Sequence, residues 1–349
     1  MTPVVVVVAM AAGFIGGLGA WVLVTRRSDE RRRRLAERDD AVRSALFRAL
    51  DDPGQPILDE LGPSDAKLLE AKARALLPAL RGSDRETLAR LLDGRGATTA
   101  ARRQCHSRRA KVRAEACQLL GDVGSSFTLL DLVPLLDDPR PAVQQAAARG
   151  LGRLGQPAGV AALLQSVDGS QPIPVDVAAD AIQQIHDWPV SQVHPSLVDR
   201  SASIRALAAE VAGRCQAIDT VPVLIDLLEN DLDPEVRVRA ARALGRIGSP
   251  RALYSLIDCV SSGPGALRTE AVAALGRMGA SAAVPTLRIT LLTPSPQLVQ
   301  SAAAALSAIE PNGVDLLLEI ADDAHHPAAT AARRALAARD ARSAAAARR

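Results

Sequence analysis

A pattern of about 31 residues recurs along this chain, and a fixed period of this length is the feature that most constrains its fold. The clearest copy begins at Asp233-Pro234 and ends at Gly248. One glycine of the pattern returns at intervals of 31, 61, 32 and 31 residues, the longest interval spanning two units: Gly121, Gly152, Gly213, Gly245 and Gly276. Repeating units of this kind stack on their neighbours. The period therefore predicts an all-α solenoid, an architecture that usually functions by presenting a surface.

Each unit is expected to form two helices. Asp233-Pro234 starts the first helix, because proline suits the first helical turn. Apolar and small residues then recur at spacings of three and four, which places them on one helical face. Gly245 and Gly248 are expected to end the first helix and make the turn to the second. Neither helix can bury its apolar face alone, so the copies must stack.

The composition restricts both the core and the partners. Hydrophobic residues make up 48% of the chain but aromatic residues only 2%, so the core must be aliphatic and closely packed. A formal net charge of +3 and scarce aromatic side chains argue against a nucleic-acid partner. The four cysteines contain no Cys-x-x-Cys pair, which indicates buried or free thiols rather than a metal site. The abundance of Ala and Arg suggests a bacterial source.

The first residues predict a membrane anchor. Residues 3–24 carry no charge, and as a helix they would measure about 33 Å, enough to cross a hydrocarbon core of about 30 Å. Arg26, Arg27 and residues 31–34 follow this run, so the positive-inside rule places the N-terminus outside and the repeats in the cytoplasm. The sequence thus predicts a single-pass protein of the bacterial inner membrane. A cleaved signal peptide is the alternative, although no Lys or Arg precedes the apolar run.

Small residues recur every fourth position in the predicted span, at Ala9, Gly13 and Gly17. Such a row lets two membrane helices approach closely, which would allow a homodimer or docking on another membrane protein. The alternative is that glycine is simply common in membrane spans.

The chain is expected to contain five segments. A transmembrane helix (1–25) precedes a charged juxtamembrane helix (26–54), and a helical cap or degenerate repeat follows (55–105). About seven repeats then occupy 106–323, and a capping helix with an Arg-rich tail occupies 324–349.

Three strings make the repeat resemble a known family: "DPEVRVRAARALGRIGSPRALYSLID", "DPRPAVQQAAARGLGRLGQPAGVAALL" and "RTEAVAALGRMGASAAVPTL". They are similar to the short bacterial HEAT-like repeats that also occur in phycobilin lyases. This resemblance covers roughly residues 107–323. It implies a right-handed superhelix used mainly for protein binding, with some enzymatic members, in which the second helices line the concave face.

Two arginine ladders are candidates for function. The first follows the recurring glycine and would form a basic edge for an acidic protein segment, or else each arginine would pair with a neighbouring carboxylate: Arg153, Arg214, Arg246 and Arg277. The second ladder follows the branched position and is expected to brace adjacent repeats against the Asp-Pro turns: Arg113, Arg205, Arg237 and Arg268.

Two further candidates lie elsewhere in the repeats. Asp226 and Asp258 share one register on the second helices and would form an acidic patch for a basic partner, or else a solvated face. Trp188 lies in a copy that lacks both glycines, where it would line a partner groove or else fill the space left by the lost regularity.

Catalytic and cofactor motifs are absent from the sequence. It has no His-Glu dipeptide, no Gly-x-Ser-x-Gly and no phosphate-binding loop, and no His or Cys pair has partners at metal spacing. We therefore expect no enzyme, metal or cofactor. The sequence predicts a membrane-anchored scaffold that recruits or regulates a partner protein. A lyase-like or chromophore-handling enzyme related to phycobilin lyases is the alternative.

Overall fold

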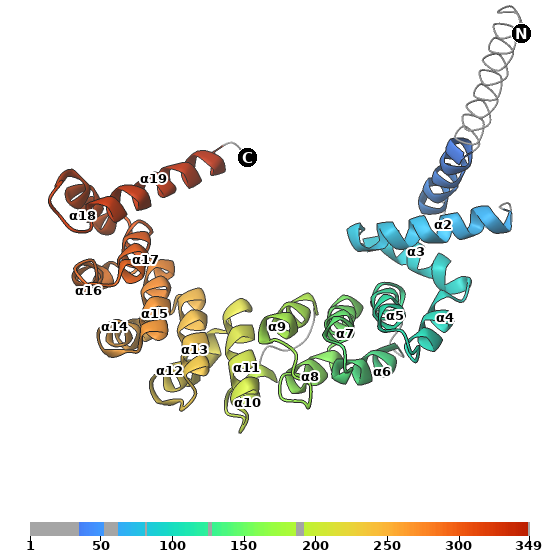
Figure 1. Ribbon diagram of the computed structural model, residues 1–349, viewed down its shortest axis with the longest axis horizontal. Coiled ribbons are helices and arrows are strands. Elements are labelled where there is room, and N and C mark those ends of the chain that lie inside the picture. Colours follow the sequence, from blue (N-terminus) through green and yellow to red (C-terminus); the bar gives the residue numbers. More distant parts are fainter. Residues whose placement is uncertain (1–34, 52–61, 81, 125–127, 186–191, 348–349) are drawn as a thin grey trace, which may run out of the picture. The chain divides into compact units, whose positions relative to one another are not determined.

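The computed structural model describes residues 35–51, 62–80, 82–124, 128–185 and 192–347, and these residues form helices and turns with no strand (Figure 1). The predicted all-α class is confirmed for this part of the chain. The chain divides into two compact units, one up to Ala100 and one from Ala101 to Arg349.

The first unit is a small set of helices. Residues 35–51 are helical and are followed by α2 (Pro63–Leu76), the 3-10 turn η1 (Leu77–Ala79), α3 (Gly82–Gly94) and the start of α4 (Ala97–Gln104). Val42, Leu69 and Leu88 are fully buried. Lys72 Nζ lies 2.6 Å from Asp39 Oδ1, so α2 is also tied to the preceding helix by charge.

The second unit is built from helix pairs. The first helices of the pairs are α5 (Ala110–Val123), α7 (Pro141–Leu154), α9 (Val175–Gln184), α11 (Ala202–Arg214), α13 (Pro234–Ile247), α15 (Gly265–Met278) and α17 (Pro296–Leu306). The second helices are α6 (Leu129–Leu132) with η3 (Val133–Asp137), α8 (Ala158–Gln165), α10 (Val193–Leu197), α12 (Val221–Asn230) after η5 (Ile218–Thr220), α14 (Leu253–Ser262) after η6 (Pro250–Ala252), α16 (Val284–Thr290) after η7 (Ser281–Ala283), and α18 (Asn312–Asp322). The last helix is α19 (Ala329–Ala346).

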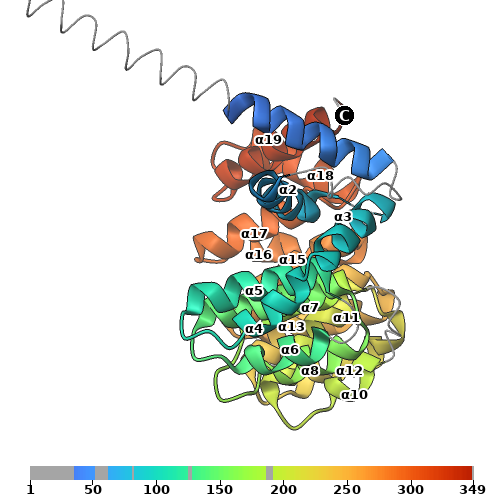
Figure 2. The same ribbon diagram turned by 90° about the vertical axis from the view of Figure 1, so that its right-hand side faces the viewer.

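The two kinds of helix form two rows within this second unit. In Figure 1 the first helices make the inner row of its arc and the second helices make the outer row. Figure 2 shows the same separation, with α6, α8, α10 and α12 gathered on one side of α5, α7, α11 and α13. The expectation that the second helices line the concave face is therefore wrong here. The fully buried Leu224, Leu244 and Leu256 belong to the core that joins the rows.

The Asp-Pro signal starts the helix as predicted. Asp233 precedes α13, and its carboxylate accepts hydrogen bonds from the backbone N–H groups of Glu235 (2.8 Å) and Val236 (3.3 Å). Pro234 is the first helical residue, where no partner for its nitrogen is needed. Gly248 closes the helix in the left-handed conformation (φ 71°), which glycine adopts readily.

The recurring glycine has a different role from the predicted helix end. Gly245 lies inside α13, and a Cβ added to it would sit 2.6 Å from both Cα and Cβ of Ala274 on α15. Gly213 meets Ala243 and Gly276 meets Ala305 in the same way, at 2.6 and 2.7 Å from the alanine Cα. The glycine therefore recurs because successive first helices pack backbone against backbone.

The predicted membrane helix (3–24), its packing row at Ala9, Gly13 and Gly17, and the homodimer through it all fall outside the described residues. Among the residues that the structure describes, no helix is long and apolar enough to cross a membrane. Helix α19 has 18 residues but carries five charges, and charged groups are costly in hydrocarbon. On this finding, the predicted localisation, a single-pass inner-membrane protein with cytoplasmic repeats, is wrong.

Replacing Gly245 by alanine tests the backbone contact. Alanine is the better helix former by about 1 kcal/mol, yet its methyl group must push α13 and α15 apart. We expect Gly245→Ala to lower the free energy of unfolding by about 1–3 kcal/mol, the usual effect of overpacking.

Gly265 is the matched control, because it begins α15 and a Cβ there would meet nothing within 4 Å. Gly265→Ala should leave stability unchanged or raise it by up to about 1 kcal/mol. Urea unfolding followed by circular dichroism measures both, and equal effects of the two substitutions would contradict the packing role.

Candidate functional site

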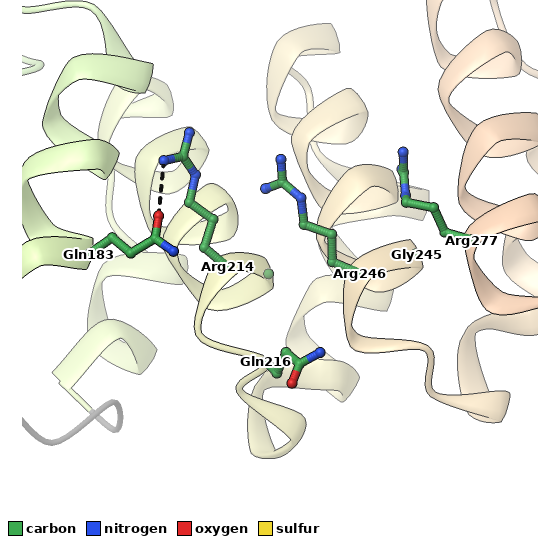
Figure 3. Close-up of a pocket in the computed structure, with 7 residues that line it drawn as sticks. Gln183, Arg214, Gln216, Gly245, Arg246 and Arg277 are labelled. Carbon is green, nitrogen blue, oxygen red and sulfur yellow. Dashed lines mark hydrogen bonds between the residues drawn. The ribbon is translucent and has the colours of Figure 1, made fainter. Parts of the chain in front are cut away.

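Three of the four arginines of the first predicted ladder come together at one groove. Arg214, Arg246 and Arg277 lie at or near the ends of α11, α13 and α15, each one residue after the packing glycine. Figure 3 shows their side chains extending in the same direction from successive helices. They line a groove of about 590 Å³ together with Gln183, Gly213, Gln216 and Gly245.

The fourth arginine of the ladder is held elsewhere. Arg153 Nε lies 3.1 Å from Asp122 Oδ1, and its Nη2 donates to the carbonyl oxygen of Gln118 at 3.4 Å. Both partners belong to α5. The structure therefore associates Arg153 with α5, and Arg153 does not line the groove.

A buried glutamate holds two of the groove arginines. Glu210 on α11 has a side chain only 1% exposed. Its Oε1 accepts hydrogen bonds from Arg246 Nη1 at 2.6 Å and from Arg214 Nε at 2.7 Å. Since a guanidinium has five N–H donors, this pairing leaves donors of Arg246 facing the groove.

Arg277, the third arginine of the groove, is held by a second glutamate. Glu270 on α15 is 13% exposed and accepts from Arg277 Nη2 at 2.7 Å and from Arg242 Nη2 at 2.9 Å. The expected pairing of each arginine with a neighbouring carboxylate is thus observed for Arg214, Arg246 and Arg277, and the basic edge for an acidic segment stays a prediction. Each arginine pairs with a carboxylate, and the glutamates that hold Arg246 and Arg277 are not among the residues that line the groove.

Sequence reasoning missed the ion network that surrounds these glutamates. Arg239 on α13 bonds Glu235 at 2.8 Å and Asp176 on α9 at 2.6 Å, and lies 3.4 Å from Glu210. The four-residue spacings Glu210–Arg214 and Glu235–Arg239 were the signal available in the sequence. The longer links between helices could not be found from spacing.

The network holds its acids ionised. Burial disfavours the charged form of Glu210, but hydrogen bonds from Arg246 and Arg214 outweigh it and keep its pKa below the usual range. Burial likewise opposes the ionisation of Glu270, and hydrogen bonds from Arg242 and Arg277 lower its pKa. Burial opposes the charge on Arg239 too, yet bonds to Asp176 and Glu235 raise its pKa.

The second ladder acts between the helices of the stack. Arg113 makes a two-pronged bond to Asp138 at 2.7 and 2.9 Å, and Arg205 makes the same bond to Asp231 at 2.7 and 2.8 Å. Paired bonds of this geometry are strong and directional. In place of a carboxylate, Arg237 and Arg268 donate to the backbone carbonyl oxygens of residues 228 and 260, both at 2.9 Å. All four brace the end of a second helix or the turn that follows it.

The other predicted residues are not brought to the groove. Asp226 on α12 and Asp258 on α14 are exposed on the outer row, and Asp226 accepts a hydrogen bond from Asn230 at 2.8 Å. Trp188 falls outside the described residues. Nor does any group of three or more His, Cys, Asp or Glu within the described ranges have the geometry to hold a metal ion.

Comparison with known proteins identifies the repeat. The family model for HEAT repeats matches residues 97–183 and 191–273, and the model for the PBS lyase HEAT-like repeat matches residues 267–292. These matches show that residues 97–183 and 191–292 contain HEAT repeats. A HEAT repeat-containing taxis protein of Halobacterium salinarum is 29% identical over 161 residues, which are 45% of this chain and 36% of that protein. The chain thus matches only about a third of the length of that relative.

Several solved structures are similar to this chain at low identity and with TM-scores below 0.5. Human deoxyhypusine hydroxylase is 20% identical with a TM-score of 0.31, covering 88% of this chain and 98% of its own. A chain of the Kap95p–RanGDP structure is 16% identical with a TM-score of 0.45, covering 78% and 44%. A computationally designed armadillo repeat protein is 19% identical with a TM-score of 0.34, covering 60% and 99%.

Replacing Glu210 by glutamine tests the network beneath the groove. The amide keeps the size of the side chain but removes the charge that Arg214, Arg239 and Arg246 share. We expect Glu210→Gln to lower the free energy of unfolding by about 2–4 kcal/mol, because it breaks a buried ion pair from one side. Glu235 is 58% exposed, so Glu235→Gln should change stability by at most about 1 kcal/mol in the same urea titration.

The pH dependence of that difference is a separate prediction. The folded-state pKa of Glu210 is lowered, so its stabilisation is complete above the unfolded value of about 4.3 and is lost as the pH falls through the folded value. The wild-type protein and Glu210→Gln should therefore differ most at neutral pH and converge below about pH 4. A stability difference that stays constant across this range would contradict the ionised pairing.

Proposed function

We propose that the repeat unit is a protein-binding scaffold, without catalytic activity of its own, which holds an acidic segment of a partner protein in the groove of Arg214, Arg246 and Arg277. The observation that carries this proposal is the make-up of the groove wall. Three arginines, two glutamines and two glycines line it, so every charged lining residue is positive.

The exposed positive charge of the groove comes mainly from Arg246 and Arg277, whose side chains are 33% and 38% exposed, because their partners Glu210 and Glu270 are only 1% and 13% exposed. Arg214 is 16% exposed and also pairs with the exposed Asp180, so it contributes less. The arrangement fixes the direction of each guanidinium before a ligand arrives. Side chains oriented in advance lose less conformational freedom on binding, and this favours affinity.

The spacing of the arginines fits an extended peptide. Packed helices lie about 8–10 Å apart, so the three guanidinium groups repeat at about that interval. An extended chain advances about 3.3 Å per residue, and three residues therefore span one repeat. A segment with a carboxylate at every third residue would meet one arginine per carboxylate, with charge-assisted hydrogen bonds between them.

A glutamate peptide of that spacing provides the test. We expect it to bind the wild-type protein saturably and to bind Arg246→Gln/Arg277→Gln about five- to thirtyfold more weakly, since partly exposed pairs contribute about 0.5–1 kcal/mol each. Fluorescence anisotropy of a labelled peptide measures this, and the affinity should also fall with added salt.

The control removes the same charge from the outer row. Arg251 lies exposed in η6 and Arg288 is an exposed residue of α16. Arg251→Gln/Arg288→Gln should bind the peptide within about twofold of wild type, because these charges lie outside the groove. The proposed function would be contradicted if both double variants bound the peptide equally weakly, or if the wild-type protein showed no saturable binding.

A further inference from the structure

Gln216 differs from the residue that three other repeats carry at the turn after the first helix. It is the one non-glycine residue with a positive φ (51°) among the residues that the structure describes. The equivalent positions, three residues after the packing glycine, are Gly155, Gly248 and Gly279, with φ of 71°, 71° and 65°. A side chain disfavours this left-handed conformation. Strained residues of this kind persist only where the surrounding structure holds them, and they cluster at functional sites.

The side chain of Gln216 lies at the border between two cavities. It lines the arginine groove, and Figure 3 shows it on the turn that follows α11, below the helices from which Arg214 and Arg246 extend. It also lines a second cavity of about 550 Å³, together with His194, Cys215, Ala217, Ile218, Asp219 and Thr220. This volume is within the range of about 300–1,000 Å³ that is typical of ligand pockets.

The second cavity differs from the groove in its chemistry. Cys215, Ala217 and Ile218 give it apolar walls, and burial raises the pKa of the Cys215 thiol, which keeps that wall uncharged. Ile218 is 69% exposed, so an apolar ligand group placed against it would remove its side chain from water. Among the described residues that line the cavity, Asp219 is the only carboxylate, and it would repel an acidic side chain.

Gln216 has the chemistry to join the two cavities. A primary amide carries both a hydrogen-bond donor and an acceptor, which match the C=O and N–H of a peptide main chain. Within the described residues its side-chain amide makes no hydrogen bond, whereas the side-chain oxygen of Gln183 accepts from Arg214 at 3.5 Å. Gln216 therefore keeps its amide available at the point where a bound segment would pass from one cavity to the other.

We propose that the partner segment is acidic at one end and carries one bulky aliphatic side chain at the other. The acidic residues lie along Arg214, Arg246 and Arg277, the aliphatic side chain enters the cavity beside Ile218, and Gln216 binds the main chain between them. This inference rests on the proposed function and adds the direction and the sequence class of the segment.

The test uses pairs of acidic peptides that differ in one residue. Both members have glutamate at every third position, and the terminal residue is leucine in one and serine in the other, placed at each end in turn. We expect leucine to raise the affinity about fivefold or more at one end only, measured by isothermal titration calorimetry on the full chain.

Two variants assign this gain to its cavity. Ile218→Ser should abolish the leucine advantage and leave the serine peptide unaffected. Val198→Ser is the matched control, because Val198 is 66% exposed but does not line the cavity, and it should keep the advantage. Loss of the advantage in both variants would overturn the assignment of the cavity.

Gln216→Gly tests the link between the cavities. Three other repeats carry glycine at this position, and glycine adopts a positive φ without strain. The thermal midpoint of unfolding should therefore stay the same or rise. Affinity for the leucine and serine peptides should fall equally, by about three- to tenfold, because the main-chain contact is common to both. A lower midpoint with unchanged affinity would show Gln216 to be structural and would overturn this part of the inference.

The outcomes separate the two proposals. If acidic peptides bind but leucine and serine bind equally at both ends, the aliphatic anchor is overturned and the scaffold function stands. If no acidic peptide binds, the proposed function fails and this inference fails with it.

Discussion

Successive first helices approach until the backbone of one touches the backbone of the next, and the other features of the repeat unit follow from this contact. At Gly245 even a methyl group would lie 2.6 Å from Ala274. Such a close approach requires glycine on one helix and a small residue on the other, and this explains why these residue types recur with the period. The contact also fixes the register, so that the residue after each glycine emerges at the same place in consecutive repeats. A row of arginines is therefore a geometric consequence of the packing.

The fixed register also places carboxylates beneath the arginines. Glu210 and Glu270 lie on the same first helices and hold guanidinium groups of their own helix and of the neighbours. An ion pair of this kind contributes little net stability compared with an apolar core, but loss of one partner is costly. Its value for function is orientation, because the arginines are directed towards the groove while the glutamate charge stays inside. The same network can thus brace the stack and prepare a surface for an acidic partner.

Much of the fold follows from the sequence because the signals are local and repeated. The Asp233-Pro234 start, the left-handed Gly248 and the register of Arg214, Arg246 and Arg277 can all be predicted from spacing. The role of Gly245 in helix packing could not be predicted from spacing, because a glycine near a helix end suits a turn as well as a close contact. The ion network could not be predicted either, because Arg239 and Asp176 form a hydrogen bond although 63 residues separate them in the sequence. Which row lies inside the arc depends on small rotations between repeats, and these leave no pattern in one chain.

The central claim is that the three groove arginines act together on an acidic segment, and the most direct measurement observes them individually. The side-chain Nε–Hε signals of ¹⁵N-arginine can be followed by nuclear magnetic resonance during titration with the glutamate peptide. The account predicts that the signals of Arg214, Arg246 and Arg277 shift together with one dissociation constant, while those of Arg113 and Arg205 stay in place because Asp138 and Asp231 hold them. Shifts confined to Arg251 and Arg288 on the outer row, or none at saturating peptide, would contradict it.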